Sequence, residues 1–301
     1  MLGIRPKETA KPKLFRQRLW NQRELCYIFC CQSTVISQGR SMKRAKHYSS
    51  VNAILSTFES RQKMQNLKYS SLEKIDVSSP ADRLAFISEK VKNKIVLDLG
   101  ALDETAYEQK ENTSFWLHKR ICEVAKRVYG VDNSSLIPEE GLKPFPNSII
   151  YKEDVYRLEK TVSKIKQIDI VVAGELIEHL TDTLSFLKSI KNIQSLQGKE
   201  LILTTPNATS LHNAIVGTLK REATHVDHLC IYSYKTLNTL CKRAGFCPWD
   251  IIPYHMAFPE MISSSHGFKK YSTILFEKLV NFGEKLFPLL CGGWIVHIKK
   301  I

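Results

Sequence analysis

Residues 169–180 read DIVVAGELIEHL and decide the fold. The apolar first half of this stretch is followed at once by Gly174, Glu175, Glu178 and His179. Two carboxylates and an imidazole at the end of a buried strand are poorly explained by packing, because a buried charge without a partner is costly. The pattern therefore predicts a strand that delivers functional side chains to the edge of a sheet.

Strands and helices alternate on both sides of this stretch. Such alternation indicates a mostly parallel sheet that helices cover on both faces. A first helix is expected to begin at Pro80, with Ser79 as its N-cap. The apolar runs that we interpret as strands cover residues 94–99, 128–131, 148–151, 168–173, 200–204, 249–253 and 293–298.

The charge of the chain is unevenly distributed. Residues 1–80 carry 15 Lys and Arg and 5 Asp and Glu, a net charge of +10, whereas residues 81–301 carry a net charge of +4. We predict a basic, flexible extension over residues 1–77 and a folded domain over residues 78–301. The extension is either attracted to nucleic acid or an anionic membrane surface, or it is a solvated tail.

Cysteine usage and hydropathy bear on the compartment. The eight cysteines are scattered without a CxxC pair, which is typical of proteins in a reducing environment. The early apolar run at residues 25–36 is too short and too polar to span a bilayer. The sequence therefore predicts a cytoplasmic protein without a transmembrane segment.

Further polar residues follow the first three predicted strands, where ligands bind in sheets of this kind. Asp98 and Gly100 end the first strand, and the glycine lets the backbone approach a nucleoside closely. Asp132 ends the second strand, where it either accepts hydrogen bonds from both hydroxyls of a ribose or belongs to a surface turn. Asp154 and Val155 follow the third strand; they suit an adenine, and Asp154 equally suits a helix cap.

A set of motifs carries a family resemblance: GELIEHL at 174–180, LILTTPN at 201–207, HVDH at 225–228 and YSYKTLNTLCKRAGF at 232–246. Together they resemble class I S-adenosylmethionine-dependent methyltransferases, in particular bacterial members that modify glycans, small hydroxylated metabolites or quinone precursors. The resemblance covers about residues 78–246. It implies a Rossmann-like, doubly wound α/β fold with a mostly parallel seven-stranded sheet and an antiparallel last strand.

The resemblance also implies S-adenosylmethionine as cofactor and methyl transfer to a hydroxyl of a glycan, a sugar or another small metabolite. The residues that it assigns to the cofactor all follow a predicted strand. They are Asp98 and Gly100 for the methionine end, Asp132 for the ribose, Asp154 and Val155 for the adenine, and Gly174 and Glu175 for the floor near the sulfonium.

The glycine-rich loop departs from the family pattern. The family often has an acidic residue followed by three alternating glycines, whereas residues 98–104 read DLGALDE and keep only the first glycine. A catalytically degenerate Rossmann-like binding protein is therefore an alternative. An NAD-dependent dehydrogenase is disfavoured, because a pyrophosphate needs the backbone N–H groups that a G-x-G-x-x-G loop supplies.

A hydroxyl acceptor must lose its proton during methyl transfer, and a histidine is the natural general base. We predict that His228 is this base and that His179 buttresses the Glu175 loop beside it; the alternative for either is a hydrogen-bonded structural role. His225 and Asp227 adjoin His228, but no distant partner is evident in the sequence, so it predicts no metal site.

The region between the last two predicted strands, residues 255–290, is expected to be an insertion. Its helix, from about residue 271 to 286, has an apolar face that either packs on its own domain or docks a lipid-linked acceptor in a peripheral membrane contact. The basic extension leaves a nucleic-acid methyltransferase as the enzymatic alternative. The sequence makes no prediction about the oligomeric state.

Overall fold

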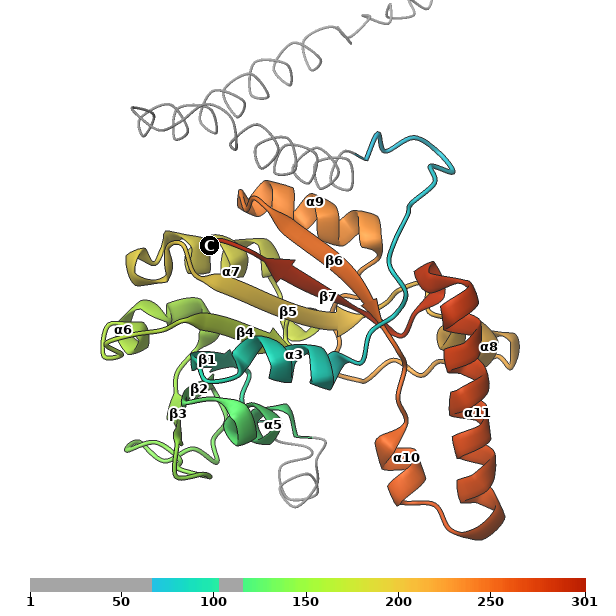
Figure 1. The fold of residues 1–301 in the computed structure, drawn as a ribbon, viewed down its shortest axis with the longest axis horizontal. Helices are drawn as coiled ribbons and strands as arrows, with labels where there is room; N and C mark the ends of the chain where they lie inside the picture. The colour runs from blue at the N-terminus through green and yellow to red at the C-terminus, as the bar shows by residue number, and fades with distance from the viewer. Residues whose placement is uncertain (1–66, 103–115) are drawn as a thin grey trace, which may run out of the picture. The chain divides into compact units, whose positions relative to one another are not determined.

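The computed structural model describes residues 67–102 and 116–301, which centre on one seven-stranded sheet (Figure 1). The strand order is β3-β2-β1-β4-β5-β7-β6, with β1 to β5 parallel and β7 antiparallel to both of its neighbours. This confirms the predicted Rossmann-like fold and its antiparallel last strand. The strands are β1 (Ile95–Leu99), β2 (Arg127–Asp132), β3 (Ser148–Lys152), β4 (Ile170–Gly174), β5 (Glu200–Pro206), β6 (Trp249–Tyr254) and β7 (Gly293–Ile298).

Helices cover both faces of the sheet because successive strand residues point to opposite sides. In β1, Leu97 and Leu99 belong to the core on one face, whereas Val96 belongs to the core on the other. The first face is covered by α6 (Glu159–Val162), α7 (Thr183–Asn192) and α9 (Tyr234–Ala244), and the second by α3 (Arg83–Val91) and α5 (Leu117–Val124) (Figure 1). Because helices cover both faces of the sheet, a ligand site is expected at the ends of the strands.

The start of α3 differs from the prediction. The helix begins at Arg83 with Asp82 as its N-cap, whose side chain accepts a hydrogen bond from the Ala85 N–H. The preceding Ala81 instead pairs with the end of β6: its N–H donates to the Pro253 carbonyl, and its own carbonyl accepts from His255. Residues 79–81 therefore do not start the helix, because tertiary pairing prevails over the local Ser-Pro signal.

Two other helices follow their sequence signals. Asp182 caps α7 by accepting from the Ser185 N–H. Ser233 and Thr236 form a reciprocal capping box at the start of α9, and Gly245 ends that helix in a left-handed conformation, with φ of 82°.

The insertion holds α10 (Pro259–Ser263) and α11 (Gly267–Leu286), and α11 contacts the unpredicted α8 (Leu211–Thr218). One side of α11 is buried through Thr273, Val280 and Glu284. The side chains that form an exposed apolar stripe on α11 are Phe268, Tyr271, Leu275, Leu279, Phe282 and Leu286. Among the described residues, no helix is long and apolar enough to cross a membrane.

Short 3-10 helices complete the connections. They are η1 (Val155–Arg157), η2 (Ile177–His179), η3 (Gln194–Leu196) and η4 (Pro288–Leu290). Of these, η2 is separated by two residues from the end of β4 and carries Glu178 and His179 of the GELIEHL motif. A single turn of 3-10 helix therefore follows the end of β4.

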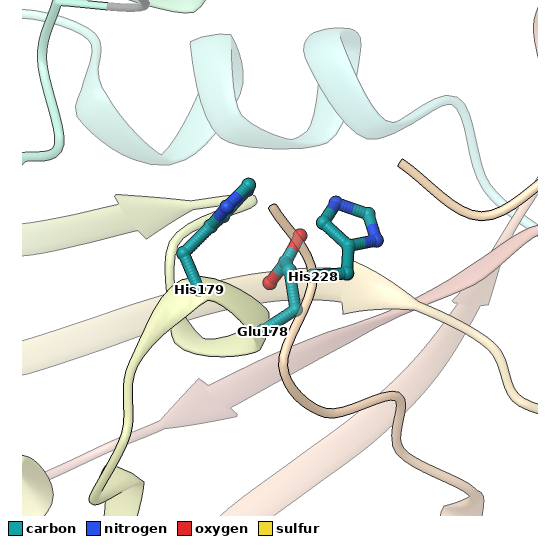
Figure 2. A group of neighbouring side chains, drawn as sticks. All are labelled: Glu178, His179 and His228. Carbon is teal, nitrogen blue, oxygen red and sulfur yellow. The ribbon is translucent and has the colours of Figure 1, made fainter. Parts of the chain in front are cut away.

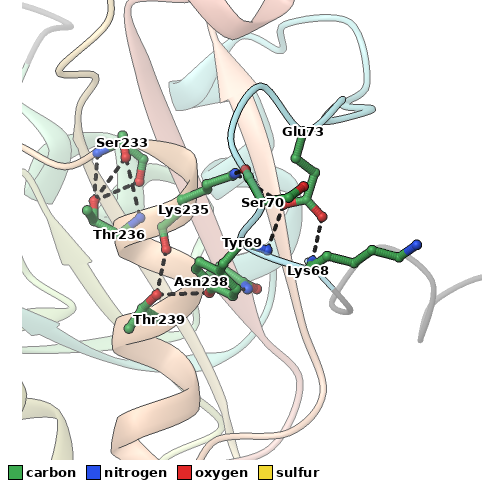
Figure 3. A network of polar contacts seen from close by, with 9 residues as sticks. All are labelled: Lys68, Tyr69, Ser70, Glu73, Ser233, Lys235, Thr236, Asn238 and Thr239. Atoms are coloured by element: carbon green, nitrogen blue, oxygen red, sulfur yellow. Dashed lines mark hydrogen bonds and ion pairs between the residues drawn. The ribbon is translucent and has the colours of Figure 1, made fainter. Parts of the chain in front are cut away.

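Residues 67–77 belong to the same compact unit as the sheet, which begins at Met64. The Tyr69 hydroxyl accepts hydrogen bonds from Asn238 and Thr239 of α9 at 3.0 and 2.8 Å, and Glu73 pairs with Lys235 at 3.1 Å (Figure 3). This part of the predicted extension thus contacts the domain. The rest of the basic extension, residues 1–66, lies outside the described residues.

Candidate active site

The carboxyl ends of β1, β2 and β4 lie next to one another. Asp98 of β1 is in register with Gly130 of β2 and with Val172 of β4. Asp132 and Gly174 therefore lie at the same edge of the sheet, close to the turn that follows Asp98. The structure brings together the residues that the sequence predicted one strand at a time.

Asp98 is buried and holds a histidine that the sequence interpretation missed. Its Oδ2 lies 2.8 Å from Nδ1 of His118, which is 1% exposed and belongs to α5. Among the described residues, Nε2 of His118 has no hydrogen-bond partner. A buried polar atom without a partner at this edge of the sheet is suited to a polar ligand.

Asp132 binds two backbone groups beyond the strand ends. Its Oδ2 accepts from the Leu102 N–H at 2.9 Å, and its Oδ1 accepts from the Ser134 N–H at 3.0 Å. The carboxylate thereby fixes the start of the loop that follows β1. A carboxylate is an acceptor of hydroxyl groups as well as of backbone N–H groups.

Asp154 and Val155 follow β3. Asp154 is exposed and caps η1 by accepting from the Tyr156 N–H, so the cap that the sequence allowed is present. Val155 is 8% exposed and packs in the core beneath. The Glu153 N–H donates to the Asp132 carbonyl, which keeps the ends of β2 and β3 together.

The two glycines at this edge have different surroundings. Gly100 has φ of +71°, a conformation that favours glycine, and its N–H donates to the Val131 carbonyl. A Cβ at Gly174 would lie 2.2 Å from the side chain of Leu117. Gly174 thus permits the close packing of α5 on the end of β4.

Glu175 adopts a left-handed conformation with φ of +50°, which non-glycine residues rarely adopt. Its N–H donates to the carbonyl and the hydroxyl of Thr204 at 3.0 and 3.1 Å. Its Oε1 accepts from the Tyr254 hydroxyl at 3.0 Å and pairs with Arg83 at 3.4 Å. Contacts from β5, β6 and α3 therefore hold the turn, and no local sequence pattern pointed to Arg83 or Tyr254.

Glu178 is fully buried, and neither of its carboxylate oxygens has a hydrogen-bond partner among the described residues. Burial raises the pKa of Glu178 well above its ordinary value, and the nearby Glu175 carboxylate raises it further. The sequence interpretation noted this carboxylate but gave it no role. Its environment calls for a proton or a cation as partner.

The predicted catalytic histidines lie beside Glu178 (Figure 2). The ring centroids of His179 and His228 are 4.7 Å apart in an edge-to-face arrangement, and His225 lies 5.6 Å from His228. Burial lowers the pKa of His228, and the two other imidazoles lower it further. His228 is therefore mainly neutral near pH 7 and offers a lone pair.

Backbone hydrogen bonds explain why these distant segments meet. The Glu178 carbonyl accepts from the N–H groups of Leu229 and Cys230, at 2.8 and 3.1 Å. The segment that carries His228 is thereby fixed against η2. This pairing joins positions far apart in the sequence, so no local pattern could have predicted it.

The residues at this edge fit an adenosyl cofactor. Asp132 ends β2 with a carboxylate, Nε2 of His118 is a buried polar atom, and Gly100 has a left-handed backbone conformation directly after β1. The cluster of Glu178, His179 and His228 follows the neighbouring β4. A Rossmann-like fold with polar groups at the carboxyl ends of its strands is suited to binding a nucleoside cofactor.

Comparison with known proteins identifies the family. The profile of a methyltransferase domain family matches residues 72–250, which is more than half of the chain. The chain belongs to this methyltransferase family, and S-adenosylmethionine is its cofactor. A search of curated proteins finds no match.

Solved structures give matches at low sequence identity. A SAM-dependent methyltransferase from Archaeoglobus fulgidus is 16% identical, with 81% of this chain and 99% of that chain covered and a TM-score of 0.42. The small RNA methyltransferase HEN1 is 14% identical, with 77% and 27% covered and a TM-score of 0.44. The YcgJ protein from Bacillus subtilis is 12% identical, with 72% and 98% covered and a TM-score of 0.40.

Proposed function

We propose that this enzyme transfers the methyl group of S-adenosylmethionine to a hydroxyl group of a glycan, a sugar or another small metabolite. The observation that carries the proposal is the convergence of Glu178, His179 and His228 beside the turn that follows β4. A hydroxyl must lose its proton as the oxygen–methyl bond forms, and polar side chains at this position are suited to that task.

The proposed cofactor site occupies the neighbouring strand ends. When bound, S-adenosylmethionine supplies a methyl group on a sulfonium, which leaves as a neutral thioether. The chain's task is then to orient the two reactants, from which much of the rate enhancement comes. The residues proposed to hold the cofactor are Asp98, Gly100, Asp132, Asp154, Val155, Gly174 and Glu175.

His228 and His179 are the proposed catalytic residues on the acceptor side. Both rings lie next to the Glu178 carboxylate, and His228 comes from the segment that is fixed to η2 by hydrogen bonds. The proton of the acceptor hydroxyl is removed there, either by the imidazole of His228 itself or with the help of a cation that the cluster holds.

The exposed stripe on α11 favours an acceptor at a membrane surface. The stripe is apolar, and α11 also exposes Lys269, Lys270, Lys278 and Lys285. The two glutamates of this helix point elsewhere: Glu277 accepts from the Phe258 N–H, and Glu284 is buried against His255. Apolar and cationic side chains together suit peripheral contact with anionic lipid, where a lipid-linked acceptor is found.

The experiment that tests the proposed function is a methyl-transfer assay with labelled S-adenosylmethionine. Glycans, sugars, lipid-linked sugars and RNA are offered in parallel to the full-length chain. Label in a hydroxyl-bearing glycan or small metabolite supports the proposal. Label in RNA alone favours the alternative that the basic extension suggested, and no label together with no cofactor binding favours a degenerate binding protein.

A further inference from the structure

The buried carboxyl group of Glu178 lies in an environment that is unfavourable for a negative charge. Its side chain is fully buried, and within residues 67–102 and 116–301 neither oxygen is hydrogen-bonded. Arg83 pairs with Glu175 at 3.4 Å and donates to Thr204, and its charge only partly opposes the rise in the pKa of Glu178. A carboxylate that is removed from water without a bonded partner is costly, so the group is stable there either protonated or paired with a cation.

Two imidazoles flank this carboxylate. One ligand atom each of Glu178, His179 and His228 can be chosen so that all three lie within 4.8 Å of one another (Figure 2). Ligands bound to one cation at about 2.1 Å lie about 3.4 Å apart in a tetrahedral site. The three ligand atoms therefore have to approach one another by about 1.4 Å or less to bind one cation.

The backbone around the cluster is ordered by internal contacts. Glu178 and His179 lie on one turn of 3-10 helix, and the Glu178 carbonyl holds the segment that carries His228. The sequence predicted no metal site because His225, Asp227 and His228 had no distant partner. The fold supplies two distant partners for His228: Glu178 and His179, on the turn of helix that follows β4.

We propose that Glu178, His179 and His228 bind a divalent transition-metal cation, with Zn²⁺ as the reference ion. Two imidazoles and one carboxylate are ligands that Zn²⁺ and its first-row neighbours prefer, whereas Mg²⁺ and Ca²⁺ prefer oxygen alone. Three protein ligands leave a coordination position open, as in catalytic metal sites. This inference deepens the proposed function: His228 acts as a ligand, and an acceptor hydroxyl can occupy the open position.

Metal binding to the chelator-treated, full-length protein tests the proposal. Isothermal titration with Zn²⁺ is expected to show one site per chain, and Co²⁺ is expected to give visible d–d absorption bands. Glu178→Gln and His228→Ala are each expected to weaken binding at least tenfold. His266→Ala, which removes an exposed histidine at the start of α11, is the matched control and is expected to leave the affinity unchanged.

Binding of S-adenosylhomocysteine by the same samples keeps the two proposals distinguishable and shows that each variant is folded. Wild-type protein that binds S-adenosylhomocysteine but takes up no stoichiometric metal would overturn the metal site alone. Equal metal affinity in wild type and Glu178→Gln would overturn it as well. Metal uptake without any S-adenosylhomocysteine binding would support the metal site and count against the proposed function.

Discussion

At the scale of single residues, Asp132 connects the cofactor edge to the loop after β1. Its two oxygens accept backbone N–H groups from Leu102 and Ser134, so the carboxylate both shapes the loop and carries the negative charge proposed to bind the ribose. Hydrogen bonds to a charged group contribute about 1.5–3 kcal/mol each.

We expect Asp132→Asn to weaken S-adenosylhomocysteine binding about tenfold, because one acceptor oxygen and the charge are lost together. Isothermal titration calorimetry measures the change. Asp76→Asn, at an exposed position that pairs only with Lys74 in the described region, is the control and should bind like wild type. Equal affinity in Asp132→Asn would remove this residue from the cofactor site.

A second residue-scale prediction concerns acid stability at the end of the sheet remote from the site. Burial lowers the pKa of His297 from its ordinary value, although its bond to Glu200 at 2.6 Å opposes the change. Burial alone would raise the pKa of Glu200, but hydrogen bonds from Lys94 and His297 outweigh it and lower that pKa. Lys90 and Lys299 also face His297, and Lys299 pairs with Asp250.

Both shifts act in the same direction. The unfolded chain binds a proton at His297 more readily than the folded chain, so stability falls as the pH drops below about 6.5; the Glu200 contribution is lost below about 4.5. We expect His297→Gln to lose less stability than wild type between pH 7 and pH 5, as measured by urea denaturation at each pH. A steeper loss in the variant would contradict this assignment.

At the scale of elements, the segment before α3 stabilises α9. Tyr69 receives two hydrogen bonds from α9 (Figure 3). The ammonium groups of Lys235 and Lys242 lie 5.9 and 5.5 Å from its ring centroid. We expect Tyr69→Ala to lower the free energy of unfolding by about 1–2 kcal/mol. Leu72→Ala removes a fully exposed side chain three positions on and should cost almost nothing. Chemical denaturation of both variants measures the difference.

The exposed face of α11 makes a separate prediction. If it contacts lipid, the protein should sediment with vesicles that contain phosphatidylglycerol and less with vesicles of phosphatidylcholine alone. Leu279→Ser combined with Phe282→Ser should abolish this binding, whereas Leu136→Ser, which changes an exposed leucine elsewhere, should not. Formation of a dimer that the double substitution dissolves, without vesicle binding, would assign the stripe to a second copy instead.

Local sequence patterns predicted most of the strands and several helix ends. A continuous apolar run marks a strand that is buried on both faces, such as β1, and Ser233 and Gly245 carry the chemistry of helix ends, so both were predictable. The start of α3 was predicted wrongly, because the pairing of Ala81 with β6 is a contact between distant parts of the chain. Predicted strand ends shifted by one or two residues for the same reason.

At the scale of the whole molecule, the order of the strands converts separate motifs into one site. Asp98, Asp132 and Gly174 lie at the carboxyl ends of strands that are adjacent in the sheet, so the topology alone places them at one edge. The pairing of Glu175 with Arg83 and the meeting of Glu178 with His228 depend on tertiary contacts and had no sequence signal. These contacts separate the proposed cofactor side, at β1 and β2, from the proposed acceptor side, at η2.

The most direct test of this arrangement is a crystal structure of the full-length chain with S-adenosylhomocysteine. The account predicts that the ribose hydroxyls bind Asp132, that the adenine lies against Val155, and that the sulfur faces the turn at Gly174 and Glu175. A nucleoside bound away from the carboxyl ends of β1, β2 and β4 would contradict it.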